Sequence, residues 1–189
     1  LEASTEIVSY SIAHGVNVVV GTSGWANDRV LELKNLVEGK LDVGVAIIPN
    51  FSLGSVLGTW MATKAAKFYD AVEIVEIHHA QKKDSPSGTA TRTAEAIAAA
   101  REGKPVQNGV DGPGRGVRVE DIPIHALRLP GVVAKQEIIF AGTGETLSIV
   151  HDTISPDAYK RGILQAIQAT VQLSGVVVGL DALLGWDSL

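Results

Sequence analysis

The sequence predicts an α/β protein in which part of a doubly wound, parallel α/β domain is joined to an α+β domain with a mixed, largely antiparallel sheet. Over residues 1–50, short apolar strands alternate with helices, which is the pattern of βαβ units in a parallel sheet. Between residues 122 and 153, three strand-like runs follow one another with glycine-containing turns, as in antiparallel sheets. The two patterns indicate two architectures in one chain.

In the first half, apolar spacing and breaker residues define each element. Val8 and Ile12 lie four residues apart, as on one face of a helix, and Gly15 suits the position after a helix end. Asn27 is expected to be the N-cap of the second helix. Continuous β-branched runs indicate strands buried on both faces. The expected order is helix 1–14, strand 16–20, helix 27–37 and strand 43–48.

The pattern changes in the second half. Trp60 and Met61 lie on a helix whose apolar face we expect to be core. Five glycines and two prolines in residues 103–121 indicate a long, mobile surface loop, either a lid or a connection. Turns at 130–131 and 142–144 predict that the last three strands form an antiparallel meander. The expected elements are helix 54–69, strand 72–77, helix 88–101, strands 122–129, 132–141 and 146–153, helix 156–173 and strand 176–180.

The change of pattern also predicts the domain boundaries. Residues 1–50 belong to the parallel domain and residues 51–155 to the α+β domain. Residues 156–189, which begin with proline in the first turn of a helix, are expected to return to the parallel domain.

Composition excludes several classes of protein. The chain of 189 residues is 46% hydrophobic and 20% charged, which rules out a wholly disordered chain. A net charge of −5 argues against nucleic acid or an anionic membrane as partner. The absence of cysteine excludes disulfides, thiolate zinc sites and cysteine nucleophiles. With no membrane-spanning run and no signal peptide in sequence, a cytoplasmic protein is expected. The chain begins with leucine and not with methionine, so we expect it to be the trailing part of a longer chain.

The densest group of reactive side chains follows the strand that ends near residue 77. His78 and His79 are adjacent, so on a strand they point to opposite faces and a single metal is unsuited to both. A histidine zinc site would also need a third ligand from far away in the sequence. A solvated strand end is the simplest alternative. His78 is a candidate general acid, because histidine titrates near pH ~6.5.

A helix start completes this group. Ser87 is a good N-cap and Gly88 lets a ligand approach the backbone. The free N–H groups of a helix N-terminus hold phosphate or carboxylate. Thr89 adds a hydroxyl, and Lys82, with Lys83 beside it, adds positive charge. These residues predict an anionic ligand. Glu76 is expected only to keep the strand end soluble.

Two polar loops follow the strands of the parallel segment. Gly21, Thr22 and Ser23 follow the first strand, and residues 48–52 follow the second. In open α/β sheets, ligands bind beyond the carboxyl ends of such strands. The two loops therefore suit a flat ligand that lies across the sheet edge, although each alone is a common kind of turn.

These segments resemble a known family. The run HHAQKKDSPSGTA at 78–90 resembles the signature of the 4-hydroxy-tetrahydrodipicolinate reductase (dihydrodipicolinate reductase) family of bacterial lysine biosynthesis. VVGTSGW at 19–25 and IPNFS at 48–52 are similar to two of its loops, and GETL at 144–147 and His151-Asp152 match later segments. The resemblance covers nearly the whole chain.

The resemblance implies a partial Rossmann nucleotide-binding domain, a substrate-binding domain that also builds a homotetramer, and reduction of a cyclic dicarboxylate by NADH or NADPH. It implies that His78 is the proton donor and Lys82 its partner in catalysis, with no metal. His79, Gly88 and Thr89 would bind the substrate. The residues implied at the dinucleotide are Gly21, Thr22, Ser23, Ile48, Pro49, Asn50 and Phe51.

The resemblance leaves alternatives open. The family's phosphate-binding loop, and the residue that selects NADH or NADPH, are expected upstream of Leu1, so the chain by itself is expected to be weakly active or inactive. A non-catalytic oligomerisation or substrate-binding fragment without a complete dinucleotide site is the main alternative. A metal-dependent hydrolase built on His78 and His79 lacks nearby carboxylates and a third ligand.

Overall fold

The computed structural model describes residues 2–22, 24–40 and 42–186. Its contacts divide the chain into two compact units. Unit 1 comprises Leu1–Leu53 and Asp157–Leu189, and unit 2 comprises Gly54–Pro156. The chain therefore passes from unit 1 to unit 2 and back, and each unit has its own sheet and its own core.

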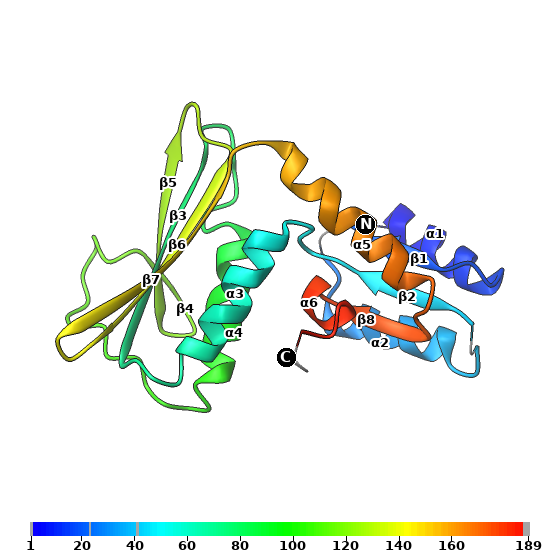
Figure 1. The fold of residues 1–189 in the computed structure, drawn as a ribbon, viewed down its shortest axis with the longest axis horizontal. Helices are drawn as coiled ribbons and strands as arrows, with labels where there is room; N and C mark the ends of the chain where they lie inside the picture. The colour runs from blue at the N-terminus through cyan, green and yellow to red at the C-terminus, as the bar shows by residue number, and fades with distance from the viewer. Residues whose placement is uncertain (1, 23, 41, 187–189) are drawn as a thin grey trace. The chain divides into compact units, whose positions relative to one another are not determined.

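Unit 1 contains a three-stranded parallel sheet in the order β1-β2-β8 (Figure 1). The strands are short and β-branched, which suits a sheet covered on both faces. The strands are β1 (Val18–Val20), β2 (Gly44–Ile47) and β8 (Gly175–Val178). The helices are α1 (Glu2–Ala13), α2 (Asn27–Val37), α5 (Lys160–Thr170) and α6 (Leu180–Leu183), and a 3-10 turn (Pro156–Tyr159) precedes α5.

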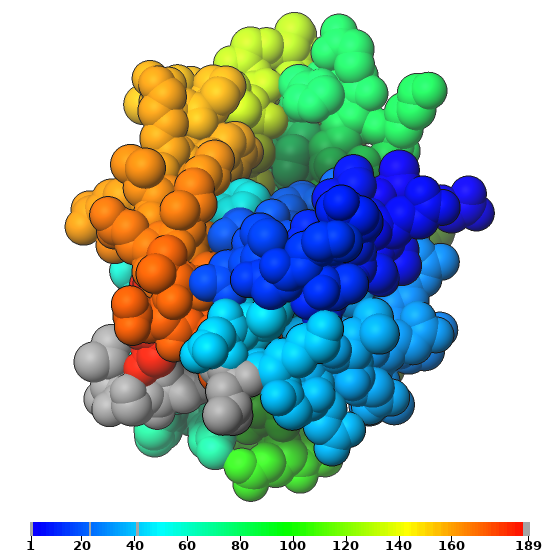
Figure 2. All heavy atoms as spheres, turned by 90° about the vertical axis from the view of Figure 1, so that its right-hand side faces the viewer, coloured from blue at the N-terminus to red at the C-terminus, as the bar shows by residue number. Residues whose placement is uncertain are grey.

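Helices cover the two faces of β2. Val45 and Ile47 are buried in one cluster with residues of α1 and α2, and these two helices form adjacent ridges on the surface in Figure 2. A side chain at position 44 would point to the opposite face, because side chains alternate along a strand. A Cβ there would lie 2.5 Å from the Leu173 carbonyl oxygen, just beyond α5, so only glycine fits. Asn27 is the first helical residue rather than the expected cap, which is Ala26.

Unit 2 contains a five-stranded mixed sheet in the order β4-β5-β3-β6-β7. The expected meander is correct for β6 and β7, which pair antiparallel, but wrong for β5, because β3 lies between β5 and β6 and pairs with β5 in parallel and with β6 antiparallel. A turn shows where the chain changes direction but not which strand it joins. The strands are β3 (Ala71–His79), β4 (Val117–Val119), β5 (Ile122–Leu129), β6 (Ala134–Gly142) and β7 (Glu145–Thr153).

Helices α3 (Leu53–Ala65) and α4 (Gly88–Ala100) pack on one face of this sheet around Ile74 and Phe140. Small residues of α3, namely Ser55, Gly58 and Ala62, form its buried face. Their spacing of three and four residues is one side of a helix. The expected core placement of Met61 is wrong, since it is 41% exposed, and Trp60 is only half-buried. The reason is that a small-residue face lets the helix approach the sheet closely, and Met61 lies outside this face.

The segment 103–121 runs over the surface, as expected, and side-chain contacts tie parts of it to the sheet. Asn108 accepts from the Val72 backbone N–H at 3.1 Å and donates to the Val72 carbonyl at 3.0 Å, as a paired strand would. Arg115 forms an ion pair with Glu73, whose other oxygen contacts His125 at 2.7 Å. The end of the segment forms β4. These contacts fix the segment as a connection packed on unit 2.

Candidate active site at the carboxyl end of β3

The helix-facing side of β3 becomes polar toward its carboxyl end. Ile74, Glu76 and His78 alternate along the strand and share this face. His79 points to the other side and is exposed, which fits the expectation that the two histidines diverge. The strand then leads through a loop into α4, so residues 76–90 form one continuous strand–loop–helix site.

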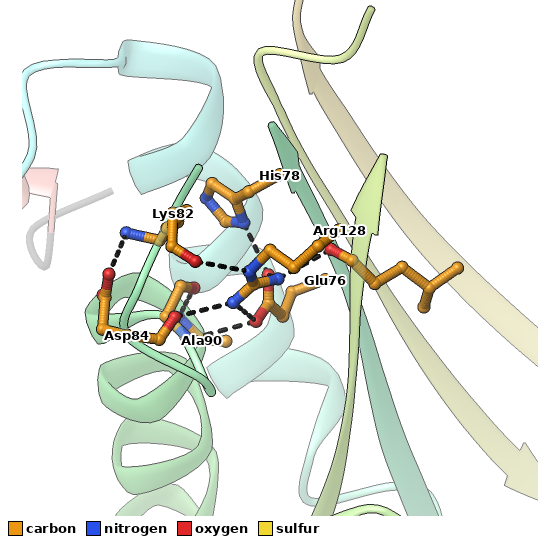
Figure 3. A network of polar contacts seen from close by, with 8 residues as sticks. Glu76, His78, Lys82, Asp84, Ala90 and Arg128 are labelled. Atoms are coloured by element: carbon orange, nitrogen blue, oxygen red, sulfur yellow. Dashed lines mark hydrogen bonds and ion pairs between the residues drawn. The ribbon is translucent and has the colours of Figure 1, made fainter. Parts of the chain in front are cut away.

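Glu76 is the buried centre of this site, with a relative exposure of 0%. Its Oε2 lies 2.5 Å from Nδ1 of His78, and its Oε1 accepts from the backbone N–H of Ser87 at 3.1 Å (Figure 3). Because a carboxylate only accepts, Nδ1 of His78 carries the proton in this bond and Nε2 is left for a ligand. The expectation that Glu76 only solubilises the strand end is wrong.

Arg128, on β5, supplies the positive charge that matches Glu76. Its two terminal nitrogens donate to the two carboxylate oxygens at 2.9 and 2.8 Å. The same guanidinium donates to the carbonyls of Lys82 at 3.3 Å and Asp84 at 2.7 Å. The parallel register of β3 and β5 places Arg128 beside His78. A single side chain thus joins the buried carboxylate to the loop before α4.

Lys82 and Asp84 show how this loop holds a carboxylate. Lys82 Nζ lies 2.8 Å from Asp84 Oδ1, and the Lys82 side chain is only 22% exposed. The bond from Lys82 is the main cause that lowers the pKa of Asp84, and the Gly88 backbone amide contributes to the same effect. The Asp84 side chain is 59% exposed. Lys82 is thus paired with a carboxylate at the surface, in the loop that leads to α4.

The start of α4 has the expected cap. Ser87 is 2% exposed and its Oγ accepts from the Ala90 backbone N–H at 3.2 Å. Gly88 is exposed and Thr89 is half-buried, so both border the surface at the helix N-terminus. Backbone N–H groups and the helix dipole favour an anion at this position.

Burial also changes the acidity of the histidines on this face. Desolvation lowers the pKa of His78 below its usual value of 6.5, although Glu76 acts in the opposite direction. Lys82 and Arg128 lower it further, because their charges disfavour an imidazolium. A histidine with a lowered pKa is a stronger proton donor when protonated.

His151 is a further half-buried residue on the same face. It lies on β7 and is in register with Gln136 of β6, which is in turn in register with Glu76. Burial lowers the pKa of His151. A Cβ on Gly54 would lie 2.6 Å from its ring, so glycine at the start of α3 makes room for the histidine. Sequence spacing gave no hint that His151 and Arg128 belong to this polar end, because the sheet order brings them there.

In unit 1, the two predicted loops lie at one edge of the sheet. Val20 and Ile47 are in register in the parallel pair, and the Ile48 N–H donates to the Val20 carbonyl at 2.8 Å. The Phe51 ring lies against Gly21, where a Cβ would be only 2.8 Å from a ring carbon. Residue 21 must therefore stay small for the two loops to meet in this way.

The remaining residues expected at the dinucleotide differ in what they can offer. Thr22 is exposed, and its hydroxyl accepts from Trp25 Nε1 at 3.1 Å. Ile48 is fully buried, so only its backbone is available. Asn50 accepts from the Ser52 backbone N–H at 2.9 Å and shapes its own turn. Pro49 is half-buried beside it, and Ser23 lies outside the described residues.

Within the described ranges, no cluster of three or more histidine, aspartate or glutamate side chains is arranged to hold a metal ion. None of the helices in that part of the chain is both long and apolar enough to cross a membrane.

A family model described as "Dihydrodipicolinate reductase, C-terminus" matches residues 54–184. The chain belongs to the 4-hydroxy-tetrahydrodipicolinate (dihydrodipicolinate) reductase family. It is 56% identical over 186 residues to the reductase of Clavibacter michiganensis subsp. michiganensis, an alignment that covers 97% of this chain and 67% of the relative. It is 41% identical over 182 residues to that of Mycolicibacterium gilvum, covering 94% of this chain and 74% of the relative.

A solved structure shows the same fold. The dipicolinate-bound dihydrodipicolinate reductase from Paenisporosarcina sp. TG-14 superposes with a TM-score of 0.84 at 34% identity, covering 96% of this chain and 69% of that chain. The expected α/β class, with a parallel sheet and a mixed sheet, is confirmed. The family is one of NAD(P)H-dependent oxidoreductases in diaminopimelate and lysine biosynthesis, which favours the enzyme over the non-catalytic alternative.

The lowered pKa values of His78 and His151 predict that unit 2 loses stability in acid. In the unfolded chain both titrate near pH ~6.5, so that state binds more protons than the folded state below this pH. The free energy of unfolding should therefore fall as pH decreases, by up to about 1.4 kcal/mol per pH unit for each histidine. Urea unfolding monitored from neutral to acidic pH measures this slope.

The replacement His151→Gln should reduce the slope. A slope that is the same in wild type and in His151→Gln would contradict the assignment.

Proposed function

We propose that the protein reduces 4-hydroxy-tetrahydrodipicolinate to tetrahydrodipicolinate with NADH or NADPH. The observation that carries this proposal is the pairing of Lys82 Nζ with a carboxylate, that of Asp84, at 2.8 Å, in the loop that leads from the half-buried His78 to the N-terminus of α4. The same arrangement can hold one carboxylate of a cyclic dicarboxylate with a proton donor next to its ring. Family membership supplies the reaction class.

The substrate grip combines charge with backbone donors. Lys82 exchanges its bond to Asp84 for a bond to the substrate carboxylate. Hydrogen bonds between charged groups are stronger than those between neutral groups. Gly88 and Thr89 offer the N-terminus of α4, where an anion is favoured. His79 is exposed at the end of β3, and its side chain would have to turn from the opposite face of the strand to make the second contact that the family resemblance implies.

His78 supplies the proton. Protonated His78 gives the proton on Nε2 to the substrate, and the neutral ring that remains keeps its other proton on Nδ1, bonded to Glu76. The overall reaction consumes one hydride and one proton, and the 4-hydroxyl group of the substrate leaves as water; bound NADH or NADPH would supply the hydride.

The loops of unit 1 fit a flat nicotinamide ring. Gly21 and Thr22 are exposed, and Gly21 lies against the ring of Phe51. Both residues follow the carboxyl end of a parallel strand, where such sheets bind ligands. Thr22, Pro49, Asn50 and the Ile48 backbone complete the set that would hold it. We place this NAD(P)H-dependent activity in the cytoplasm, where biosynthetic reductants are available.

Replacement of His78 tests the proton donor. In the protein with a complete dinucleotide-binding domain, His78→Gln should lower turnover by roughly 10²–10⁴-fold, the usual contribution of a general acid, whereas the dissociation constant of dipicolinate should change little. Steady-state kinetics and isothermal titration calorimetry measure the two quantities. His14→Gln is the control, and near-normal turnover in His78→Gln would reject this role.

Two adjacent lysines provide a matched test of the carboxylate grip. In Lys82→Met, dipicolinate should bind at least about tenfold more weakly, because a charge-assisted bond is lost. In Lys83→Met, which changes an exposed neighbour, affinity should remain near that of the wild type. Calorimetry with both variants makes the comparison, and equal affinities would show that Lys82 does not hold the carboxylate.

We further assign a homotetramer to the face of the unit 2 sheet opposite α3 and α4. Leu127, Leu129 and Val150 lie on this face and are 37%, 43% and 53% exposed. Apolar side chains exposed on a sheet face favour association.

A charge placed on this face should therefore disrupt the assembly. Val150→Lys should give a smaller species in light scattering coupled to gel filtration, whereas Val110→Lys, at an 87% exposed loop position, should not. An unchanged mass for Val150→Lys would place the interface elsewhere.

A further inference from the structure

We propose that Glu76 is the positioning residue of this reductase: it holds the ring of His78 in one tautomer and one orientation, and Arg128 keeps Glu76 charged while buried. This inference rests on the proposed function, because it concerns the residue proposed there as proton donor. It assigns a catalytic consequence to Glu76, which has no exposed surface, and to its partner Arg128.

The first argument is the burial of the carboxylate. Glu76 is 0% exposed, whereas charged side chains are almost never fully buried unless they are paired. It lies two residues before His78 on the same strand face, and its Oε2 is in hydrogen-bond contact with Nδ1 of His78 at 2.5 Å. A carboxylate that serves solubility would be exposed, so the burial indicates a specific role.

The second argument is the tautomer. Glu76 accepts from Nδ1, so the neutral ring of His78 must have its proton on Nδ1 and a lone pair on Nε2. This is the ring that remains when Nε2 has given its proton to the substrate. A carboxylate that orients a histidine in this way, and favours its imidazolium form, is a recurrent catalytic arrangement.

The third argument concerns Arg128. It makes two bonds to the carboxylate, which counters the cost of burying that charge. It also donates to the backbone carbonyls of Lys82 and Asp84, so the orientation of Glu76 and the place of the Lys82 loop depend on one guanidinium (Figure 3). The same arginine therefore helps to position both the proposed proton donor, His78, and the loop that carries Lys82.

Unit 2 provides its own control. Glu73 lies on the same strand, contacts the ring of His125 at 2.7 Å and pairs with Arg115. These are the same three residue types, but they lie on the opposite face of β3, where Glu73 is 26% exposed. Glu73→Gln thus makes the same chemical change away from the site.

The direct test is the tautomer of His78 in protein labelled with ¹⁵N in its histidines, with the signal identified by its loss in His78→Gln. At a pH where the ring is neutral, wild type should show the proton on Nδ1. In Glu76→Gln, the amide N–H₂ can donate to Nδ1, and the proton should move to Nε2. Glu73→Gln should leave the His78 signals unchanged. An unchanged His78 tautomer in folded Glu76→Gln would overturn the proposal.

Kinetics supply a second readout. Glu76→Gln should lower kcat at least about tenfold, and by less than the roughly 10²–10⁴-fold expected for the loss of a general acid, with little change in KM. Added to His78→Gln, it should cause no further loss, because it acts through that ring. An equal additional loss in the His78→Gln background would show a merely structural effect and overturn the proposal.

Arg128→Lys tests the orientation of His78 and the position of the Lys82 loop separately. It also provides a measurement if Glu76→Gln does not fold. A lysine keeps the charge beside Glu76 but cannot make all of the guanidinium's bonds. The His78 tautomer should stay on Nδ1, while dipicolinate binds about tenfold more weakly, because the Lys82 loop is released. Movement of the proton to Nε2 in this variant, with Glu76 present, would contradict the role of Glu76.

The failure of this inference is distinguishable from that of the proposed function. If His78→Gln retains normal turnover, the proton donor has been assigned wrongly, but the tautomer measurement still reports whether Glu76 holds the ring. If His78→Gln is inactive and Glu76→Gln leaves tautomer and kcat unchanged, only the positioning role is lost.

Discussion

A single buried carboxylate organises the polar end of unit 2. Glu76 has no exposed surface, so each of its oxygens must find a partner within the protein. The partners come from three places in the fold: His78 on the same strand, Arg128 on β5 and the Ser87 amide at the start of α4. Removing one partner would leave a buried charge partly uncompensated, which is strongly destabilising. The geometry of the site and the folding of this region therefore depend on the same contacts.

The two glutamates of β3 show that position, more than residue type, decides what such a cluster does. Glu73 and Glu76 each contact one histidine and one arginine. Because they are three residues apart on a strand, they point to opposite faces. On the open face, the set around Glu73 ties a long connection to the sheet. On the helix-covered face, the set around Glu76 holds a histidine beside a helix N-terminus, where an anion can bind.

Much of the local structure followed from the sequence, because capping and periodicity act over a few residues. Ser87 caps α4 as expected, and the strand–loop–helix order of residues 71–100 was predicted closely. The burial of α3 was predicted poorly, since its small residues face the sheet and Met61 does not. The apolar pattern of that helix marks its large residues, whereas close packing on a sheet selects the small ones.

By itself, the sequence determined the two kinds of sheet, the loops that follow the parallel strands, the cap and glycine at the start of α4, and the family. These features depend on neighbours in the chain or on a contiguous motif. Only the tertiary structure decided that β3 lies between β5 and β6. That order brings Arg128 to Glu76 from 52 residues away and places His151 on the same polar face. No local pattern encodes such partners, because strand pairing is settled by which faces bury together when the whole sheet forms.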